Sequence, residues 1–297
     1  MKKYKNNYLP YILLLIQPAF MATNSIIARA GVIHVPPISL AFFRWFLVFL
    51  ILLPFTINNI SKNRNYLNKE YKKLFFLGFM GCGVCGAFPF LAGMTTTVTN
   101  IGIIYTSSPI FIILISTIFF KEKIFRLQIY GLALCLFGVL LIIMKGKISL
   151  LISLKFTSGD LWVLGAAIGW ALYAIFLLRW KSKFSFFARF CLIAFLGSVS
   201  LFPFTIIENI FVREINFGKY FYFWTLFAAI SPGIIAYTIH QKVQKSLGAS
   251  TTGFILFLFA IYGAFYGIIF FNERLEIYHY VGAFLVFIGV FFAKKKT

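Results

Sequence analysis

The segments YTSSPIFIILISTIFFKEK (residues 105–123) and LFLFAIYGAFYGIIFFNER (residues 256–274) decide the fold of this chain. Both are long apolar runs, and both end in IFF, one polar residue, a Glu and a basic residue. A shift of 151 residues superposes the two endings, and it also brings Gly282 onto Gly131 and Gly289 onto Gly138. The chain therefore contains an internal repeat, and each copy ends an apolar helix at the same corner.

The composition places the chain in a membrane. Of its 297 residues, 61% are hydrophobic and only 12% are charged, whereas soluble domains carry roughly 25% charged residues. The apolar residues form blocks long enough to cross a bilayer, which takes about 20 residues. Lipid offers no hydrogen bonds to the backbone, so these blocks must be helices. The net charge of +21 comes from Lys and Arg in short links, which indicates membrane topology and argues against nucleic-acid binding.

We expect an all-α membrane protein with ten transmembrane helices. Their expected ranges are 8–29, 38–57, 74–94, 101–120, 127–144, 160–179, 186–207, 220–240, 251–271 and 277–293. If the amino-terminus is cytoplasmic, 20 of the 28 Lys and Arg residues fall on the cytoplasmic side and 7 on the other side. This is the bias of the positive-inside rule, so both termini are expected in the cytoplasm. The longest link, near 58–73, is expected to be a polar connector.

The repeat divides the chain into residues 1–150 and 151–297, with five helices in each half. Because five is odd, the second copy enters the membrane the opposite way up. Inverted repeats are typical of transporters that work by alternating access, with the substrate site where the repeats meet near the membrane midplane. We expect a multi-pass protein of the cell membrane, which in a bacterium is the inner membrane.

Several motifs resemble the drug/metabolite transporter superfamily in its ten-span, EamA-type form. Residues 99–144 are similar to the most recognisable stretch of that family, and the resemblance covers nearly the whole chain. The residues that carry it are Pro109, Glu122, Gln128, Gly131, Gly138, Pro37, Leu40, Ala41, Phe42, Arg44, Gly159, Asp160, Trp170, Tyr173 and Leu247–Ser250. The resemblance implies a carrier of amino acids or related metabolites. One departure is Ala260, which stands where the family usually has a second proline, so the second helix is expected to be straighter than the first.

Polar and aromatic side chains inside the spans are candidates for a substrate cavity, because polar groups in lipid are costly and tend to line cavities. We expect the substrate site to draw on Gln17, Asn24, Arg44, Asn100, Tyr105, Ser108, Trp170, Tyr173, Tyr237 and Tyr262. Each has a plainer alternative. The amides can hydrogen-bond between helices, the aromatic rings can anchor at the membrane interface, and Arg44 can be structural or can bind an anionic group.

Other reactive residues are expected to be structural. Glu122 and Glu273 lie at helix ends beside basic residues, where they suit a cap or a local ion pair. His240 is read as an interfacial residue. Cys82 and Cys85 lie in mid-span without a second ligand pair, so we expect packing and no metal site.

The leading functional hypothesis is therefore a small-molecule transporter, either an exporter or a facilitator. No carboxylate is expected in mid-membrane, which argues against proton coupling. No cofactor is expected, and the partners are a small-molecule substrate and membrane lipids. The alternatives are a channel, which needs a polar ring along one axis, and a membrane-embedded enzyme, which needs a clustered catalytic constellation. The sequence leaves the substrate, the direction of transport and the oligomeric state open.

Overall fold

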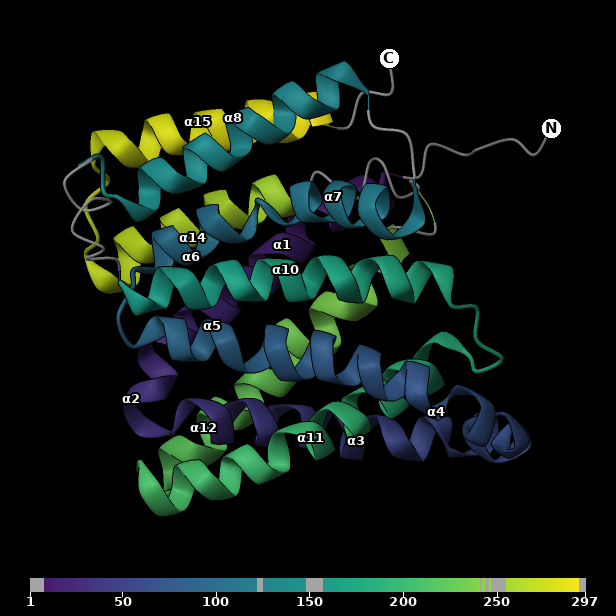
Figure 1. Ribbon diagram of the computed structural model, residues 1–297. Helices are drawn as coiled ribbons and strands as arrows, with labels where there is room; N and C mark the ends of the chain where they lie inside the picture. The colour runs from purple at the N-terminus through teal and green to yellow at the C-terminus, as the bar shows by residue number, and fades with distance from the viewer. Residues whose placement is uncertain are drawn as a thin grey trace.

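The protein is a bundle of helices, described here from a computed structural model (Figure 1). The structure describes residues 8–121, 125–147, 157–240, 242, 243, 246 and 255–293, and no strand occurs in these ranges. The helical elements are α1 (Leu9–Ile26), η1 (Ile27–Gly31), α2 (Val32–His34), α3 (Pro37–Lys62), α4 (Arg64–Gly78), η2 (Phe79–Val84), α5 (Cys85–Gly93), α6 (Val98–Tyr105), α7 (Ser108–Phe120), α8 (Arg126–Ile143), α10 (Ser158–Arg179), α11 (Phe186–Phe211), α12 (Lys219–Ala228), η3 (Ala229–Ile235), α14 (Ile255–Phe271) and α15 (Ile277–Ala293). The three η elements are π-helical segments that continue the α-helices before them.

Seven helical stretches in the described chain are long and apolar enough to cross a membrane. They are Leu9–His34, Pro37–Lys62, Arg64–Gly93, Val98–Phe120, Ser158–Arg179, Phe186–Phe211 and Lys219–His240. Three shorter apolar helices, Arg126–Ile142, Leu258–Phe271 and Ile277–Gly289, complete the set. The protein is therefore an all-helical membrane protein.

The expected polar connector at 58–73 is helical for most of its length. Helix α3 runs to Lys62 and α4 begins at Arg64, so this stretch is helical apart from one turn at Asn63. Ile60 and Leu67 within it pack against the core.

The two segments with the shared ending differ in the way that Pro109 and Ala260 predict. The first segment breaks into α6 and α7 at Thr106 and Ser107, whereas α14 is one continuous helix. Pro109 has no backbone N–H, so it cannot bond the carbonyl of Tyr105 four residues earlier. The Ser108 hydroxyl donates to that carbonyl at 2.5 Å instead. The break is thus satisfied within the helix itself.

Helices α8 and α15 lie side by side along one edge of the bundle (Figure 1) and cross through glycines. A Cβ on Gly138 would lie 2.7 Å from the Gly282 carbonyl, and a Cβ on Gly289 would lie 2.6 Å from the Gly131 carbonyl. Both distances are too short for any larger residue, so the backbones touch as in other small-residue interfaces of membrane helices. The 151-residue shift pairs Gly131 with Gly282 and Gly138 with Gly289, whereas in the structure Gly138 contacts Gly282 and Gly131 contacts Gly289.

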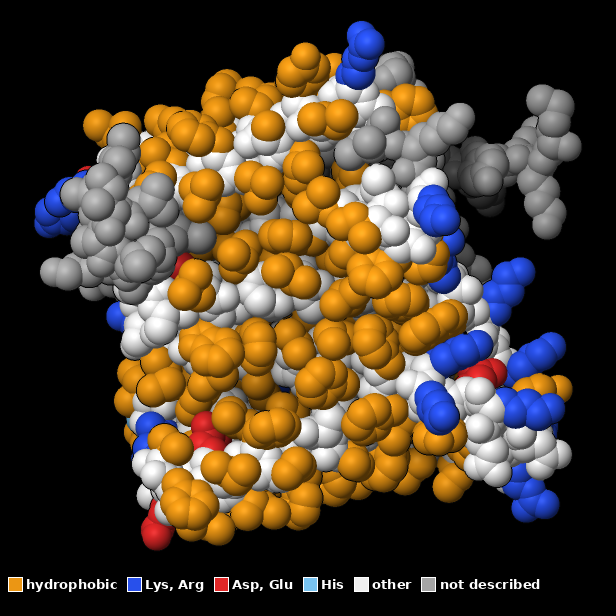
Figure 2. Space-filling model, viewed as in Figure 1, with side chains coloured by type: hydrophobic (Ala, Val, Ile, Leu, Met, Phe, Trp, Pro, Cys, Tyr) orange, Lys and Arg blue, Asp and Glu red, His pale blue; other side chains and the backbone are white. Residues whose placement is uncertain are grey.

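Basic side chains gather at one end of the molecule (Figure 2). On the face shown, most Lys and Arg lie at the right-hand end, where α3 meets α4 and α10 leads to α11, and the long sides are almost entirely apolar. The exposed apolar side chains in the middle of the helices include Phe137 at 57% and Phe265 at 53% exposure. Such a surface suits lipid and not water.

Candidate functional site

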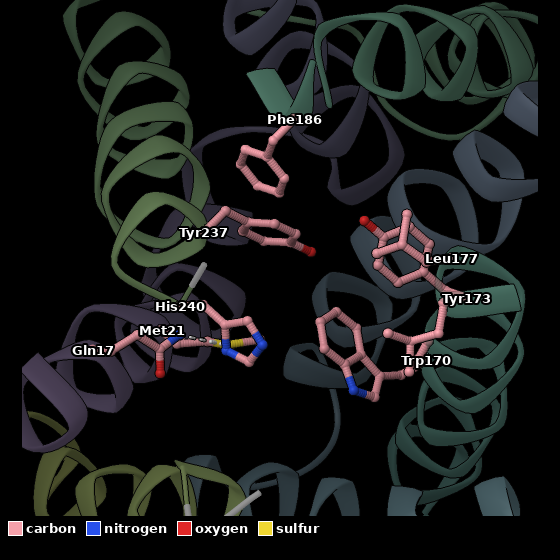
Figure 3. A pocket seen from close by; sticks show the side chains of 10 residues that line it. Gln17, Met21, Trp170, Tyr173, Leu177, Phe186, Tyr237 and His240 are labelled. Atoms are coloured by element: carbon pink, nitrogen blue, oxygen red, sulfur yellow. Dashed lines mark hydrogen bonds between the residues drawn. The ribbon is translucent and has the colours of Figure 1, made fainter. Parts of the chain in front are cut away.

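A cavity of about 110 Å³ lies between α10 on one side and α1 and residues 236–240 on the other (Figure 3). Its walls are aromatic and apolar with a few polar groups. The lining residues are Gln17, Met21, Trp170, Tyr173, Ala174, Leu177, Leu178, Phe186, Tyr237 and His240. Leu178 is 67% exposed, and it lies one residue before the end of α10. The cavity therefore lies toward the end of the bundle where α10 stops and α11 begins, and it borders the molecular surface at Leu178.

The spacing of the lining residues along their helices explains why they face one space. Trp170 and Tyr173 are three residues apart on α10. Tyr237 and His240 have the same spacing in the helical residues 236–240, so each pair shares one face of its own helix. The Trp170 ring lies 5.5 Å from that of Tyr173 and 6.3 Å from that of Tyr237. In Figure 3 the hydroxyl ends of Tyr173 and Tyr237 point toward one another across the cavity.

Gly81 makes room for the Tyr173 ring. A Cβ at this position of η2 would lie 2.5 Å from the Tyr173 Cδ2 atom. The glycine thus lets the ring lie flat against the π-helical segment, and the position of Tyr173 depends on it. π-helical segments often occur at functional sites, and here η2 forms the backing of the cavity wall.

A second chamber of about 30 Å³ lies deeper in the bundle and contains Arg44. It shares Met21, Trp170 and Tyr237 with the first cavity, so the two adjoin. Its remaining lining residues are Asn24, Arg44, Trp45, Cys85, Pro89, Ile101, Tyr105, Pro232 and Phe259. They come from six stretches of the chain, and only a few of them are polar.

The Arg44 guanidinium is buried and is held by neutral groups. Nη1 donates to Asn24 Oδ1 at 2.6 Å, and Nη2 donates to the Pro232 carbonyl at 3.4 Å. Its carbon lies 4.4 Å from the centre of the Trp45 ring, which is a cation–π contact. Arg44 is 3% exposed, and its Nε has no hydrogen-bond partner in the described part of the chain. No described carboxylate lines either chamber.

Two more buried polar atoms around the chambers have no partner among the described residues: Gln17 Oε1 and Trp45 Nε1. Buried polar groups are normally paired, and each one left unpaired costs about 1–3 kcal/mol. The Gln17 amide nitrogen is used, because it donates to the Ala236 carbonyl at 3.3 Å and to Met21 Sδ at 3.4 Å. Trp45 Nε1 packs against Gly86, where a Cβ would lie 2.5 Å from it. The Gln17 Oε1 acceptor and the Arg44 Nε donor are therefore available beside the chambers, and a polar ligand could pair with them.

The opposite end of the bundle is held by a buried polar network. Asp160, near the start of α10, accepts hydrogen bonds from Thr96, Thr157 and Asn100, the last from Nδ2 at 3.1 Å. Asn100 Oδ1 lies 3.2 Å from His279 Nε2. The network joins α6, α10 and α15 through side chains that are each at most 5% exposed, apart from Thr157.

Two further contacts tie the same end. Glu273 follows α14 and accepts from the backbone N–H groups of Val98 and Thr99, so it caps α6. Arg29 in η1 donates to the Gly93 carbonyl at 3.0 Å. The anchoring role expected for Glu273 is thus seen as a cap on another helix, and among the described residues it forms no ion pair. Glu122 lies outside the described residues.

The structure brings seven of the ten predicted site residues to the chambers. They are Gln17, Asn24, Arg44, Tyr105, Trp170, Tyr173 and Tyr237, of which Trp170 and Tyr237 line both spaces. The other three lie elsewhere. Asn100 belongs to the network at the opposite end, Ser108 bonds the Tyr105 carbonyl, and Tyr262 lies 6.3 Å from the Tyr266 ring.

Several lining residues were not predicted. His240, read from the sequence as interfacial, lines the first cavity beside Gln17. Phe259 and Pro232 are apolar residues within long apolar runs, and nothing in the sequence distinguishes them from residues that face lipid. Met21 carries the one usable signal, because it shares a helix face with Gln17 and Asn24 at spacings of four and three residues.

The cysteines are all free and buried. Cys85 lines the deeper chamber and its thiol donates to the Ala166 carbonyl at 3.4 Å. Within the described ranges, no group of three or more His, Cys, Asp or Glu side chains is arranged to hold a metal ion.

Comparison with known proteins places the chain among transporters. It is 23% identical over 96% of its length to an uncharacterized transporter of Archaeoglobus fulgidus, of which it covers 97%. It is 24% identical to the uncharacterized transporter YyaM of Bacillus subtilis, over 94% of this chain and 92% of that protein. A crystal structure with 14% sequence identity superposes with a TM-score of 0.56 over 96% of this chain and 95% of that one, which supports the fold alone.

The family model gives the assignment. The model of the EamA-like transporter family matches residues 9–144 and again residues 157–294. The two matches cover nearly the whole chain and fall in the two halves that carry the repeated endings. This chain is therefore a member of the EamA-like transporter family, and it is a membrane transporter.

Proposed function

We propose that this transporter moves amino acids or related small metabolites by alternating access, as an exporter or a facilitator. The observation that carries the proposal is the contrast between the two ends of the bundle. A cavity lined by Trp170, Tyr173 and Tyr237 lies toward one end, and the network around Asp160 and Asn100 ties the other end. A carrier in a conformation that is open on one side of the membrane and closed on the other has a cavity near one end and tight contacts at the other.

The membrane arrangement follows from the same proposal. The seven long and three shorter apolar helices would make ten spans, with residues 1–150 and 151–297 as two inverted repeats. The basic end, where α3 meets α4, would face the cytoplasm together with both termini. The cavity lies toward this end, so in the proposed cycle the conformation described would be the one open to the cytoplasm.

Opening of the opposite end would need the buried polar contacts there to separate. Asp160, Asn100 and His279 come from three different helices, and movement of α6 and α10 apart would break their hydrogen bonds. The glycine crossing of α8 and α15 offers a smooth surface along which helices can slide. The cycle would thus exchange polar contacts at one end for contacts at the other.

The driving force we propose is the substrate gradient. The buried described carboxylates are Asp160 and Glu208, and both lie near helix ends and are engaged by hydrogen-bond donors. Neither lines the chambers, where a proton-coupling carboxylate is expected in many carriers.

Purified protein in liposomes tests the proposal. Counterflow of labelled amino acids and related acids and amines into preloaded vesicles should exceed that of empty vesicles. The Tyr237→Ala variant should slow it, because Tyr237 lines both chambers. Absence of flux for every compound would refute the transport proposal. Strong accumulation driven by an imposed pH gradient would leave transport standing and refute the facilitator mechanism.

A further inference from the structure

The deeper chamber carries an uncompensated positive charge. Arg44 has two neutral hydrogen-bond partners, Asn24 and the Pro232 carbonyl, and the second bond is long at 3.4 Å. The remaining contacts of the guanidinium are with the faces of Trp45 and Phe90. Burial of a charge in a medium of low dielectric constant is costly unless a counter-charge is close. Arg44 therefore favours an anion from outside the chain.

The two buried carboxylates of the described chain do not serve as that counter-charge. Asp160 lies ten residues before Trp170 on α10, or about 15 Å along the helix axis, and its oxygens accept from three other side chains. Glu208 accepts from the backbone of Ile38 and Ser39 and from the Ser39 hydroxyl. Both carboxylates are committed to the ends of the bundle.

The unused donor and acceptor atoms also indicate how an anion would bind. Arg44 Nε is buried and has no partner among the described residues. It belongs to a residue that lines the deeper chamber. A guanidinium with an unused N–H donor suits a carboxylate, which accepts from several donors and carries one negative charge. A phosphate carries nearly two charges and would leave one of them without compensation here.

We propose that the substrate is an organic monoanion, a carboxylate with an apolar or aromatic body and no cationic group. Its carboxylate binds at Arg44, and its body lies against Trp170, Tyr173 and Tyr237 in the adjoining cavity. This inference rests on the proposed transport function and narrows its substrate class from amino acids to their analogues without the amino group. The walls of both chambers match such a body, because they are mainly apolar and aromatic.

A zwitterionic amino acid fits this site less well. Its ammonium group would find the Gln17 Oε1 atom and the aromatic faces but no described carboxylate. The bound zwitterion would also leave the net charge of the chamber at +1, whereas a monoanion reduces it to zero. An amine without a carboxylate would add a second positive charge to the same space. The expected order of affinity is monoanion, then zwitterion, then cation.

Three matched probes test the order: 3-phenylpropionate, phenylalanine and 2-phenylethylamine, which share one aromatic body and differ in charge. Affinity would be measured by calorimetry on the purified protein at neutral pH, and transport by counterflow in proteoliposomes. We expect 3-phenylpropionate to bind about tenfold or more tightly than phenylalanine, with the amine weakest.

The decisive variant is Asn24→Asp. It places a carboxylate where the Asn24 amide oxygen lies 2.6 Å from Arg44 Nη1, with almost no change in size and with the hydrogen bond retained. This internal counter-charge should abolish the preference for the monoanion. Asn209→Asp is the control, because it makes the same substitution outside the chambers. Asn209 lies near the end of α11, where its Oδ1 accepts a hydrogen bond from the Ile215 N–H. The control should keep the wild-type order.

The outcomes separate the two proposals. Phenylalanine or the amine binding as tightly as 3-phenylpropionate would overturn the charge assignment and leave transport intact. The same holds if the preference survives Asn24→Asp unchanged, or if other metabolites are transported while none of the three probes binds. Should Asn24→Asp fail to fold, the wild-type order still decides. If no compound of any class is bound or transported, the proposed transport function itself fails, and this inference fails with it.

Discussion

Removal of the Glu273 carboxylate should destabilise the end of the bundle opposite the cavity. The side chain accepts hydrogen bonds from the Val98 N–H at 2.7 Å, the Thr99 N–H at 3.0 Å and the Thr99 hydroxyl at 2.7 Å. It thereby joins the end of α14 to the start of α6. Glu273→Ala removes all three bonds and leaves two backbone donors at a helix start without a partner.

The magnitude follows from the number and type of these bonds. A hydrogen bond to a charged group contributes about 1.5–3 kcal/mol. The three bonds share one half-buried carboxylate and are not additive, so we expect a total loss of about 3 kcal/mol. At roughly 2–4 °C per kcal/mol, the apparent melting temperature should fall by about 6–12 °C.

The assay is thermal unfolding in detergent, in which size-exclusion chromatography measures the fraction of protein still folded after heating to each temperature. Glu276→Ala is the matched control, three residues further along in the same link, because the Glu276 side chain is exposed and makes no hydrogen bond or ion pair with the described residues. Its melting temperature should change by less than about 1 °C. An equal decrease in melting temperature for both variants would show that the effect comes from loss of any negative charge in this link. An unchanged melting temperature for Glu273→Ala would refute the capping argument.

Three further predictions concern the network, the glycine crossing and the cavity wall. Asp160→Asn replaces an acceptor oxygen of the buried network by a donor, so proteoliposome counterflow should slow several-fold and the melting temperature should fall, whereas an unchanged flux would show that the network has no part in the cycle. Gly138→Leu should abolish folded yield, because a Cβ there already lies 2.7 Å from a backbone carbonyl; Gly218→Ala, whose nearest contact is a side-chain oxygen at 3.2 Å, should be expressed normally. Gly81→Ala should displace the Tyr173 ring and weaken ligand binding measured by calorimetry, while equal affinity would mean that the ring does not contact the ligand.

Much of the architecture could be predicted from the sequence because lipid imposes strict rules on it. Apolar length identifies helices when backbone groups have no other partners, and the single proline at Pro109 identifies the break between α6 and α7. The stretch 58–73 shows the limit of this approach. Its polarity is that of a loop and also that of a helix outside the apolar layer, and composition alone does not distinguish the two.

The candidate site could be predicted only in part, for a physical reason. Arg44 and Gln17 stand out because a polar group in a span needs an explanation. Asn100 stood out for the same reason, but it is explained by Asp160 and by His279, which lies 179 residues away. The sequence does not show which polar residues satisfy one another across the bundle. Apolar wall residues such as Phe259 carry no signal at all in a chain of this composition.

The self-contained break between α6 and α7 has a mechanical consequence. Thr106, Ser107 and Ser108 each donate a hydroxyl to the carbonyl three residues earlier, so this joint can bend without recruiting water into the membrane interior. Its counterpart α14 is one continuous helix and has no such joint. The two halves of a transport cycle would then cross barriers of different height, because movement of the first repeat can bend the break between α6 and α7, whereas movement of the second repeat has no such break in α14. A carrier built in this way would load and unload at unequal rates even under symmetric conditions.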